Sequence, residues 1–200
     1  MKGVRRLPRS FYARDPREVA PELLNKVLVC GSRSGRIVET EAYVGDIDPG
    51  AHSYRGRTPR TEVMFGRPGR LYVYLSYGMH WCCNPVCGPV GTGWAVLIRA
   101  VEPMLGLDDM RPLRPKARRD IDLTNGPGKL TQALGITDVH NGADLATGDR
   151  DVWIGDDRTP TPHDPVVTTR IGFGNNPARD LPWRWFVPDN PYVSRRAGAR

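Results

Sequence analysis

Residues 36–44 read Arg-Ile-Val-Glu-Thr-Glu-Ala-Tyr-Val, and the predicted fold is built around this stretch. Residues that favour strands, with a glycine on either side of the stretch, indicate a β-strand. Because successive side chains of a strand point to opposite faces, Glu39, Glu41 and Tyr43 are expected on one face. Ile37 would share that face. The opposite face would carry Val38, Thr40, Ala42 and Val44. The strand should therefore present two carboxylates and a phenol side by side.

Further strands and short helices are predicted around this stretch. Apolar or alternating segments predict strands at residues 27–30, 70–77, 94–101, 152–154, 166–173 and 183–187. Start signals such as Asp15-Pro16 and stop signals such as Gly135 predict helices over residues 16–25, 102–113 and 125–135. Residues 46–68 are rich in Gly, Pro and Arg, which indicates a long irregular loop. We therefore predict an α+β fold with a curved, mostly antiparallel sheet and peripheral short helices, in a single domain over residues 1–200.

The chain carries an excess of positive charge. It has 29 Lys and Arg against 22 Asp and Glu, a net charge of +7, and only four of the basic residues are Lys. A planar guanidinium binds phosphate oxygens in pairs, so this composition favours nucleic acid as a partner. The basic residues concentrate at 2–14, 55–70 and 111–119, although such runs are also typical of solvated loops. No membrane-spanning run or signal peptide is recognisable, so we expect a cytoplasmic, nucleoid-associated protein without a membrane partner.

Three of the four cysteines are clustered in a way that could suggest metal ligands. Cys82, Cys83 and Cys87 lie close together after His80, and Cys30 is the fourth cysteine of the chain. A Cys-x-x-Cys pair and a second ligand cluster are both missing, so the spacing disfavours zinc. We expect free thiols and no metal.

Two further features suggest a hydrolytic site that binds bases. Arg99 interrupts the apolar strand at 94–101, and beside Glu39 and Glu41 it could orient a water that a carboxylate activates. A structural ion pair is the alternative interpretation. Residues 71–84 are rich in Tyr and Trp, which in a basic protein suggests base stacking, although aromatic residues also favour sheets for packing alone.

Together these motifs resemble the alkyladenine (3-methyladenine) DNA glycosylase family. The resemblance begins with the strand at 36–44 and the following His52-Ser53, and it continues in collinear order through most of the chain. The further matching blocks are Met64-Phe-Gly, Leu71-Tyr-Val-Tyr, Tyr77-Gly-Met, Asn84, residues 95–103, Gly126-Pro-Gly-Lys-Leu130 and Arg170-Ile-Gly-Phe-Gly174. The chain differs from the common pattern at Thr61, Ser76 and Cys82-Cys83, and these differences leave the range of accepted lesions open.

The resemblance implies a role for each site residue. Glu41 would be the general base, with Arg99 and the main-chain carbonyl of Ile171 holding the attacking water, and Glu39 would be structural. The implied base pocket has Tyr43 and His52 on one side of the flipped base and Tyr74 on the other. Asn84 would lie at the rim or floor of this pocket. Tyr77 would fill the gap left in the duplex.

The implied activity is that of a monofunctional DNA glycosylase. It would flip alkylated or deaminated purines out of double-stranded DNA and hydrolyse the N-glycosidic bond with a Glu-activated water, which initiates base excision repair. The resemblance implies no cofactor, and we expect a monomer. Two other classes of protein share some of these features. A nucleic-acid-binding module would not need Glu41 beside Arg99, and a zinc nucleobase deaminase needs His-x-Glu and Pro-Cys-x-x-Cys motifs that the chain lacks.

Overall fold

The structure is a computed structural model that describes residues 3–194. Its strands are β1 (Arg5–Arg6), β2 (Val27–Cys30), β3 (Arg33–Val44), β4 (Leu71–Ser76), β5 (His80–Cys87), β6 (Trp94–Leu105), β7 (Val152–Asp156), β8 (Val166–Thr168) and β9 (Arg184–Phe186). Its α-helices are α1 (Arg9–Tyr12), α2 (Pro16–Glu22), α3 (Leu107–Leu113), α4 (Ile121–Thr124) and α5 (Pro127–Leu134). Short 3₁₀ turns lie at Gly45–Ile47, Glu62–Phe65, Asp138–His140, Asp149–Asp151 and Pro177–Asp180. Lys2 of the first basic run and the ends of the predicted 1–200 domain lie outside the described residues, and that domain remains a prediction.

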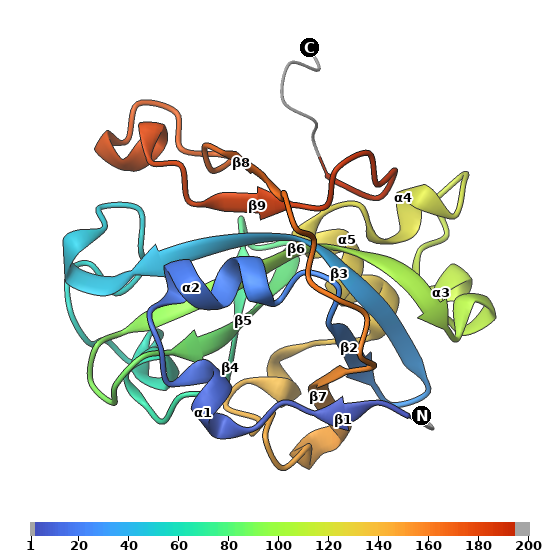
Figure 1. Cartoon of the computed structure of the whole chain (residues 1–200), viewed down its shortest axis with the longest axis horizontal. Helices are drawn as coiled ribbons and strands as arrows, with labels where there is room; N and C mark the ends of the chain where they lie inside the picture. The colour runs from blue at the N-terminus through green and yellow to red at the C-terminus, as the bar shows by residue number, and fades with distance from the viewer. Residues whose placement is uncertain (1–2, 195–200) are drawn as a thin grey trace.

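One curved sheet organises the described part of the chain (Figure 1). The strand order is β1-β7-β2-β3-β6-β5-β4, with β9 also pairing with β3, and β8 pairing with β9. Neighbouring strands are antiparallel throughout. The long strands β3 and β6 lie side by side in the middle of the sheet, and the short helices lie around it. The predicted α+β class with a curved antiparallel sheet is confirmed.

A bulge in β3 changes the predicted alternation. Val38 has no partner on β6, because Ile37 pairs with Val101 while Glu39 pairs with Ala100. An extra residue on one strand shifts the following side chains relative to the preceding ones. Ile37 consequently packs in the main core, while Val38 packs against Phe186. The prediction that Ile37 shares the face of Glu39 was therefore wrong.

The predicted helix at 102–113 was also wrong in its first half. β6 continues to Leu105 because β3 extends back to Arg33 and pairs with this region, for example Gly35 with Pro103. The strand ends at Leu105, and the next residue, Gly106, has a φ of 75° and precedes the start of α3 at Leu107. Pairing of β6 with β3 thus outweighs the local sequence Glu102-Pro103, which by itself favours the start of a helix.

Three other boundaries differ from the sequence-based prediction. The strand β5 was not predicted, although it completes a hairpin with β4 around Gly78. The strand predicted at 166–173 ends at Thr168, and residues 169–174 form an irregular segment at the site. The helix α2 ends at Glu22 rather than near Asn25, whose φ of 65° is not helical.

The main hydrophobic core lies between the sheet and helices α2 and α5. Val19 of α2, Leu23 directly after α2, Leu130 of α5 and Ile98 of β6 are all fully buried in it. Burying each such side chain contributes about 1.5–3 kcal/mol relative to leaving it exposed. This packing fixes β3 and β6, the two strands that carry the candidate site. No helix among residues 3–194 is long and apolar enough to cross a membrane.

Candidate active site

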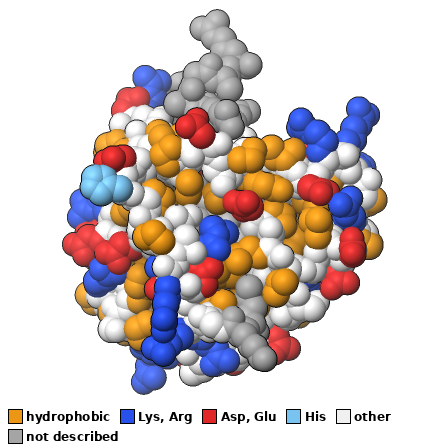
Figure 2. All heavy atoms as spheres, turned by 45° about the vertical axis from the view of Figure 1, so that its right-hand side comes forward, with side chains coloured by type: hydrophobic (Ala, Val, Ile, Leu, Met, Phe, Trp, Pro, Cys, Tyr) orange, Lys and Arg blue, Asp and Glu red, His pale blue; other side chains and the backbone are white. Residues whose placement is uncertain are grey.

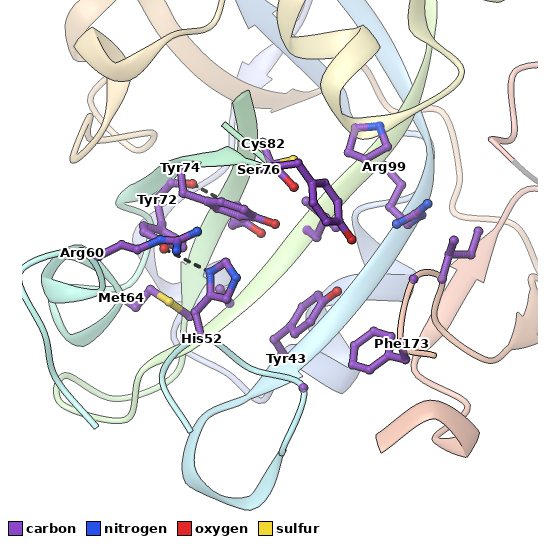
Figure 3. A pocket seen from close by; sticks show the side chains of 18 of the residues that line it. Tyr43, His52, Arg60, Met64, Tyr72, Tyr74, Ser76, Cys82, Arg99 and Phe173 are labelled. Atoms are coloured by element: carbon purple, nitrogen blue, oxygen red, sulfur yellow. Dashed lines mark hydrogen bonds between the residues drawn. The ribbon is translucent and has the colours of Figure 1, made fainter. Parts of the chain in front are cut away.

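A cavity of about 550 Å³ is lined by residues that lie far apart in the sequence, from Tyr43 to Asn176 (Figure 3). Its lining comes from β3, β4, β5 and β6, from the loop after β3, from the start of α5 and from the irregular segment after β8. Seven of the eight residues predicted for the site line it, namely Tyr43, His52, Tyr74, Tyr77, Asn84, Arg99 and Ile171. The eighth, Glu41, lies directly beneath, with no exposed surface of its own.

Glu41 is held by three residues that themselves line the cavity. Its Oε1 atom accepts a hydrogen bond from the backbone N–H of Ile171 at 2.8 Å and lies 3.2 Å from Nη1 of Arg99. Its Oε2 atom accepts from the hydroxyl of Tyr43 at 2.9 Å. Burial raises the pKa of Tyr43 and the neighbouring Glu41 raises it further, so the phenol remains a donor. The contact that Ile171 makes to Glu41 is through its N–H, and the predicted use of its carbonyl remains a prediction.

Glu39 stands beside Glu41 on the same face, as predicted, in a separate network. It accepts from Nε of Arg99 at 2.9 Å and from Nε of Arg184 at 2.6 Å. The backbone N–H and the hydroxyl of Ser194 complete its shell. Arg99 therefore bridges the two carboxylates. Burial opposes the charge on Arg99, but Glu41 and Glu39 outweigh it and raise the pKa of Arg99.

Aromatic rings form two walls of the cavity. On one wall His52 meets Tyr74 edge to face with the ring centroids 4.5 Å apart, and its Nδ1 lies 3.2 Å from the hydroxyl of Tyr72. On the other wall Tyr43 stacks on Phe173 at 6.3 Å. Figure 3 shows His52 on the side of Tyr72 and Tyr74. In this structure His52 thus shares a wall with Tyr74, whereas the family resemblance implied that it lies on the side of Tyr43.

Asn84 and Tyr77 occupy different parts of the β4–β5 hairpin. Asn84 is buried opposite Tyr72, and its Nδ2 donates to the backbone carbonyl of Tyr72 at 3.0 Å. Tyr77 is at the hairpin tip, where its side chain is 86% exposed. Its φ of 50° lies in the left-handed region that non-glycine residues rarely adopt, next to Gly78 at 67°. Such strain at an exposed aromatic is typical of functional positions.

Some site residues were not singled out from the sequence. Phe173 lies in a segment whose predicted strand does not form, so its contact with Tyr43 could not be foreseen. Tyr72 was seen only as part of an aromatic run. Arg60 belongs to the predicted basic run at 55–70, and its position over the Tyr74 ring depends on the path of the loop.

The basic runs are only partly free of acidic partners. In the run at 111–119, Arg111 pairs with Asp120 and Arg119 with Asp122. In the first run, Arg14 pairs with Glu22. Figure 2 shows basic and acidic side chains intermixed on the face that it displays. Charge runs in the sequence therefore overstate the local positive charge, because acids from outside the run fold onto them.

The comparisons with known proteins agree with this site. The family model described as methylpurine-DNA glycosylase (MPG) matches residues 10–191. A protein from Burkholderia lata is 56% identical over 94% of this chain and 90% of its own length. One from Carboxydothermus hydrogenoformans is 49% identical over 95% and 99%. One from Methanoculleus marisnigri is 48% identical over 95% and 99%. Each bears the name "Putative 3-methyladenine DNA glycosylase".

These matches show that the protein is a DNA glycosylase, a hydrolase that acts on N-glycosyl bonds in DNA repair. The chain belongs to the methylpurine-DNA glycosylase family. The family expected from the sequence motifs is thereby confirmed, and DNA is the substrate.

Proposed function

We propose that the enzyme flips alkylated purines, 3-methyladenine among them, and deaminated purines out of duplex DNA and cleaves their glycosidic bond with water. The observation that carries this proposal is the buried Glu41 beneath a cavity with aromatic walls, held by Arg99, Tyr43 and Ile171. The names of the relatives support the alkylated substrates. The product would be an abasic site that begins base excision repair.

The cavity suits an extruded purine. A purine cannot be attacked at its glycosidic carbon while it is stacked, so the base must leave the duplex. Alkylation at a ring nitrogen makes the base cationic, and the faces of Tyr43 and Tyr74 attract cations. His52 lies against Tyr74. Burial lowers the pKa of His52, and the charge of Arg60 lowers it further, so the imidazole ring is neutral near pH 7 and does not repel a cationic base.

Glu41 serves as the general base in this proposal. Cleavage passes through an oxocarbenium-like state, and an anionic carboxylate near it stabilises the positive charge and accepts the proton of the attacking water. The water's oxygen bonds to C1′ while the C1′–N bond breaks and its electron pair leaves with the base. Because Glu41 has no exposed surface, water must enter between its three partners, with Arg99 and the Ile171 carbonyl positioning it.

The reaction is proposed to be monofunctional. Of the lysines, Lys129 lies nearest in the sequence to a cavity residue, Pro127, and its Nζ donates to Asn125 at 2.8 Å at the start of α5. A phosphate contact is the simpler role for a lysine at a helix start. The abasic strand should therefore stay intact until alkali is added.

Tyr77 is the proposed wedge. Its exposed ring at the hairpin tip would enter the stack and offset part of the few kcal/mol that unstacking costs. We propose that the enzyme acts as a monomer on double-stranded DNA, because the cavity is complete within one chain.

The experiment is a panel of duplexes that each contain one lesion. 3-Methyladenine, 7-methylguanine, hypoxanthine and ethenoadenine duplexes are incubated with the enzyme, and abasic sites are revealed by alkaline strand scission. Excision of alkylated purines with strand breaks only after alkali is the expected result. Breaks without alkali would contradict the monofunctional assignment, and no excision of any lesion would contradict the proposed function.

A further inference from the structure

A guanidinium group lies against each aromatic wall of the cavity. One of the two is neutralised by a carboxylate, and among the described residues the other is not. Arg170 lies 4.7 Å from the ring centroid of Tyr43, and both oxygens of Asp48 bind it at 2.6 and 2.7 Å. Arg60 lies 5.4 Å from the ring centroid of Tyr74. Within residues 3–194, no carboxylate forms an ion pair with Arg60. The Tyr74 wall therefore carries a net positive charge that the Tyr43 wall does not.

The position of Arg60 is fixed by the loop that carries it. Thr61 is buried, and its hydroxyl accepts from the backbone N–H of Thr58 at 2.9 Å. The two threonine hydroxyls also lie 3.0 Å apart, which closes a tight turn around Arg60. Arg60 lines the cavity, and Figure 3 shows its side chain beside Tyr72 and directed toward Tyr74 and His52.

Arg60 acts on the wall electrostatically. Burial raises the pKa of Tyr72, while the charge and hydrogen bonding of Arg60 oppose this shift. Burial lowers the pKa of His52, and Arg60 lowers it further. The guanidinium is therefore close enough to influence both polar groups of this wall.

We propose that Arg60 is a specificity-determining residue that disfavours cationic alkylated purines relative to neutral damaged purines in the cavity. The inference rests on the proposed function. A purine alkylated at N3 or N7 is cationic in DNA and would use the face of Tyr74 by the same cation–π attraction that Arg60 uses. Arg60 competes with it for that ring and repels it. A neutral base such as hypoxanthine meets no such repulsion, and its carbonyl oxygen can accept a hydrogen bond from the guanidinium.

The test measures binding, because repulsion of a cationic base acts before the bond breaks. Dissociation constants are measured in the Glu41→Gln protein, so that lesions persist, for duplexes with 7-methylguanine, with hypoxanthine and with no lesion. Adding Arg60→Gln should shift the ratio of the two lesion constants about threefold to tenfold in favour of 7-methylguanine. Arg60→Lys keeps the charge and should leave the ratio within about twofold.

Arg57→Gln is the matched control. Arg57 lies in the same loop over Phe65 and pairs with Glu62, outside the cavity lining. Loss of the Arg57 charge should lower the affinity for all three duplexes by the same factor. If Arg60→Gln also lowers the affinity for all three duplexes by the same factor, or leaves the ratio of the two lesion dissociation constants unchanged, Arg60 only attracts DNA and the proposal is overturned. If the Glu41→Gln protein itself prefers neither lesion to undamaged DNA, base capture fails and the proposed function falls together with this inference.

Discussion

Arg170 and Asp48 form a bidentate salt bridge in which both side chains are fully buried. Nη1 and Nη2 of Arg170 donate to the two carboxylate oxygens at 2.6 and 2.7 Å. Nη1 also donates to the carbonyl of Ala42. This pair ties the segment after β8 to the loop after β3, so it places Ile171, the next residue, against Glu41. A structural ion pair thereby sets the geometry of the candidate catalytic carboxylate.

Asp48→Asn should destabilise the protein strongly. Removing one charge of a buried pair leaves the other uncompensated, which typically costs about 3–5 kcal/mol. The free energy of unfolding is measured by urea denaturation. Asp164→Asn is the control, because Asp164 and its partner His163 are almost fully exposed and that exposed pair should contribute little. A loss below about 1 kcal/mol for Asp48→Asn would show that Arg170 finds other partners.

The catalytic strand could be predicted because its evidence is local. Strand propensity and period-two alternation placed Glu39, Glu41 and Tyr43 on one face, and the structure agrees. The bulge at Val38 could not be foreseen, because it arises from the register of β3 against β6. The alternation of residues along a strand predicts the direction of each side chain only where the pairing with the neighbouring strand contains no bulge.

Contacts between distant segments were beyond the sequence alone. Phe173 stacks on Tyr43 from an irregular segment that the Arg170–Asp48 pair ties to the loop after β3. The hydrogen bonds of Arg184 and Ser194 to Glu39 join residues about 150 positions apart, and local sequence signals carry no information on such non-local contacts. The family resemblance supplied roles for Arg99 and Ile171, but their contacts with Glu41 came from the fold.

Binding to undamaged duplex should weaken steeply as salt rises from about 50 to 200 mM, because counterion release dominates nonspecific affinity. Internal ion pairs such as Arg111 with Asp120 reduce the number of arginines free to bind phosphate. The slope of log affinity against log salt should therefore be well below the value for all 29 basic residues. Fluorescence anisotropy measures it, and a flat response would contradict phosphate binding.

Tyr77→Ala should lose stable binding to lesion-bearing duplex while the far-UV circular dichroism stays normal. Tyr77 is 86% exposed, so its removal takes little from the core, whereas a wedge is lost entirely. Alanine keeps a Cβ at the same positive φ, so the backbone cost remains and stability should change little. Val90→Ala, another exposed apolar residue outside the cavity, should change neither property. Unchanged lesion affinity with unchanged excision would mean that Tyr77 has no role in DNA binding.

Asn84→Ser should widen the range of accepted purines toward guanine-type bases. Asn84 lines the cavity, and its amide is fixed by the Tyr72 carbonyl, so we expect it to present a rigid polar group to the edge of a bound purine. The shorter serine removes that group. Release of 7-methylguanine is compared with release of 3-methyladenine from methylated DNA. If the proportion of 7-methylguanine does not rise, Asn84 does not discriminate between purines.

Glu41→Gln should abolish excision and preserve binding to lesion-bearing DNA. The amide keeps the shape of the side chain and loses its basicity, and a lost general base typically costs a factor on the order of 10² to 10⁴ in rate. Single-turnover excision at saturating enzyme measures the chemical step alone. Retention of activity within a few fold of the parent would remove Glu41 from the mechanism.

Glu39→Gln separates a positioned base from a general loss of negative potential, because both carboxylates contact Arg99 on the same strand face. A field effect should slow both variants alike. Glu39 also neutralises Arg184, so its variant should lose stability, and rates must be measured well below its unfolding temperature. We expect Glu39→Gln to keep most of its rate when folded, since the Tyr43 and Ile171 contacts to Glu41 remain. If Glu39→Gln is instead the inactive variant while its fold is intact, the assignment of the two carboxylates must be exchanged.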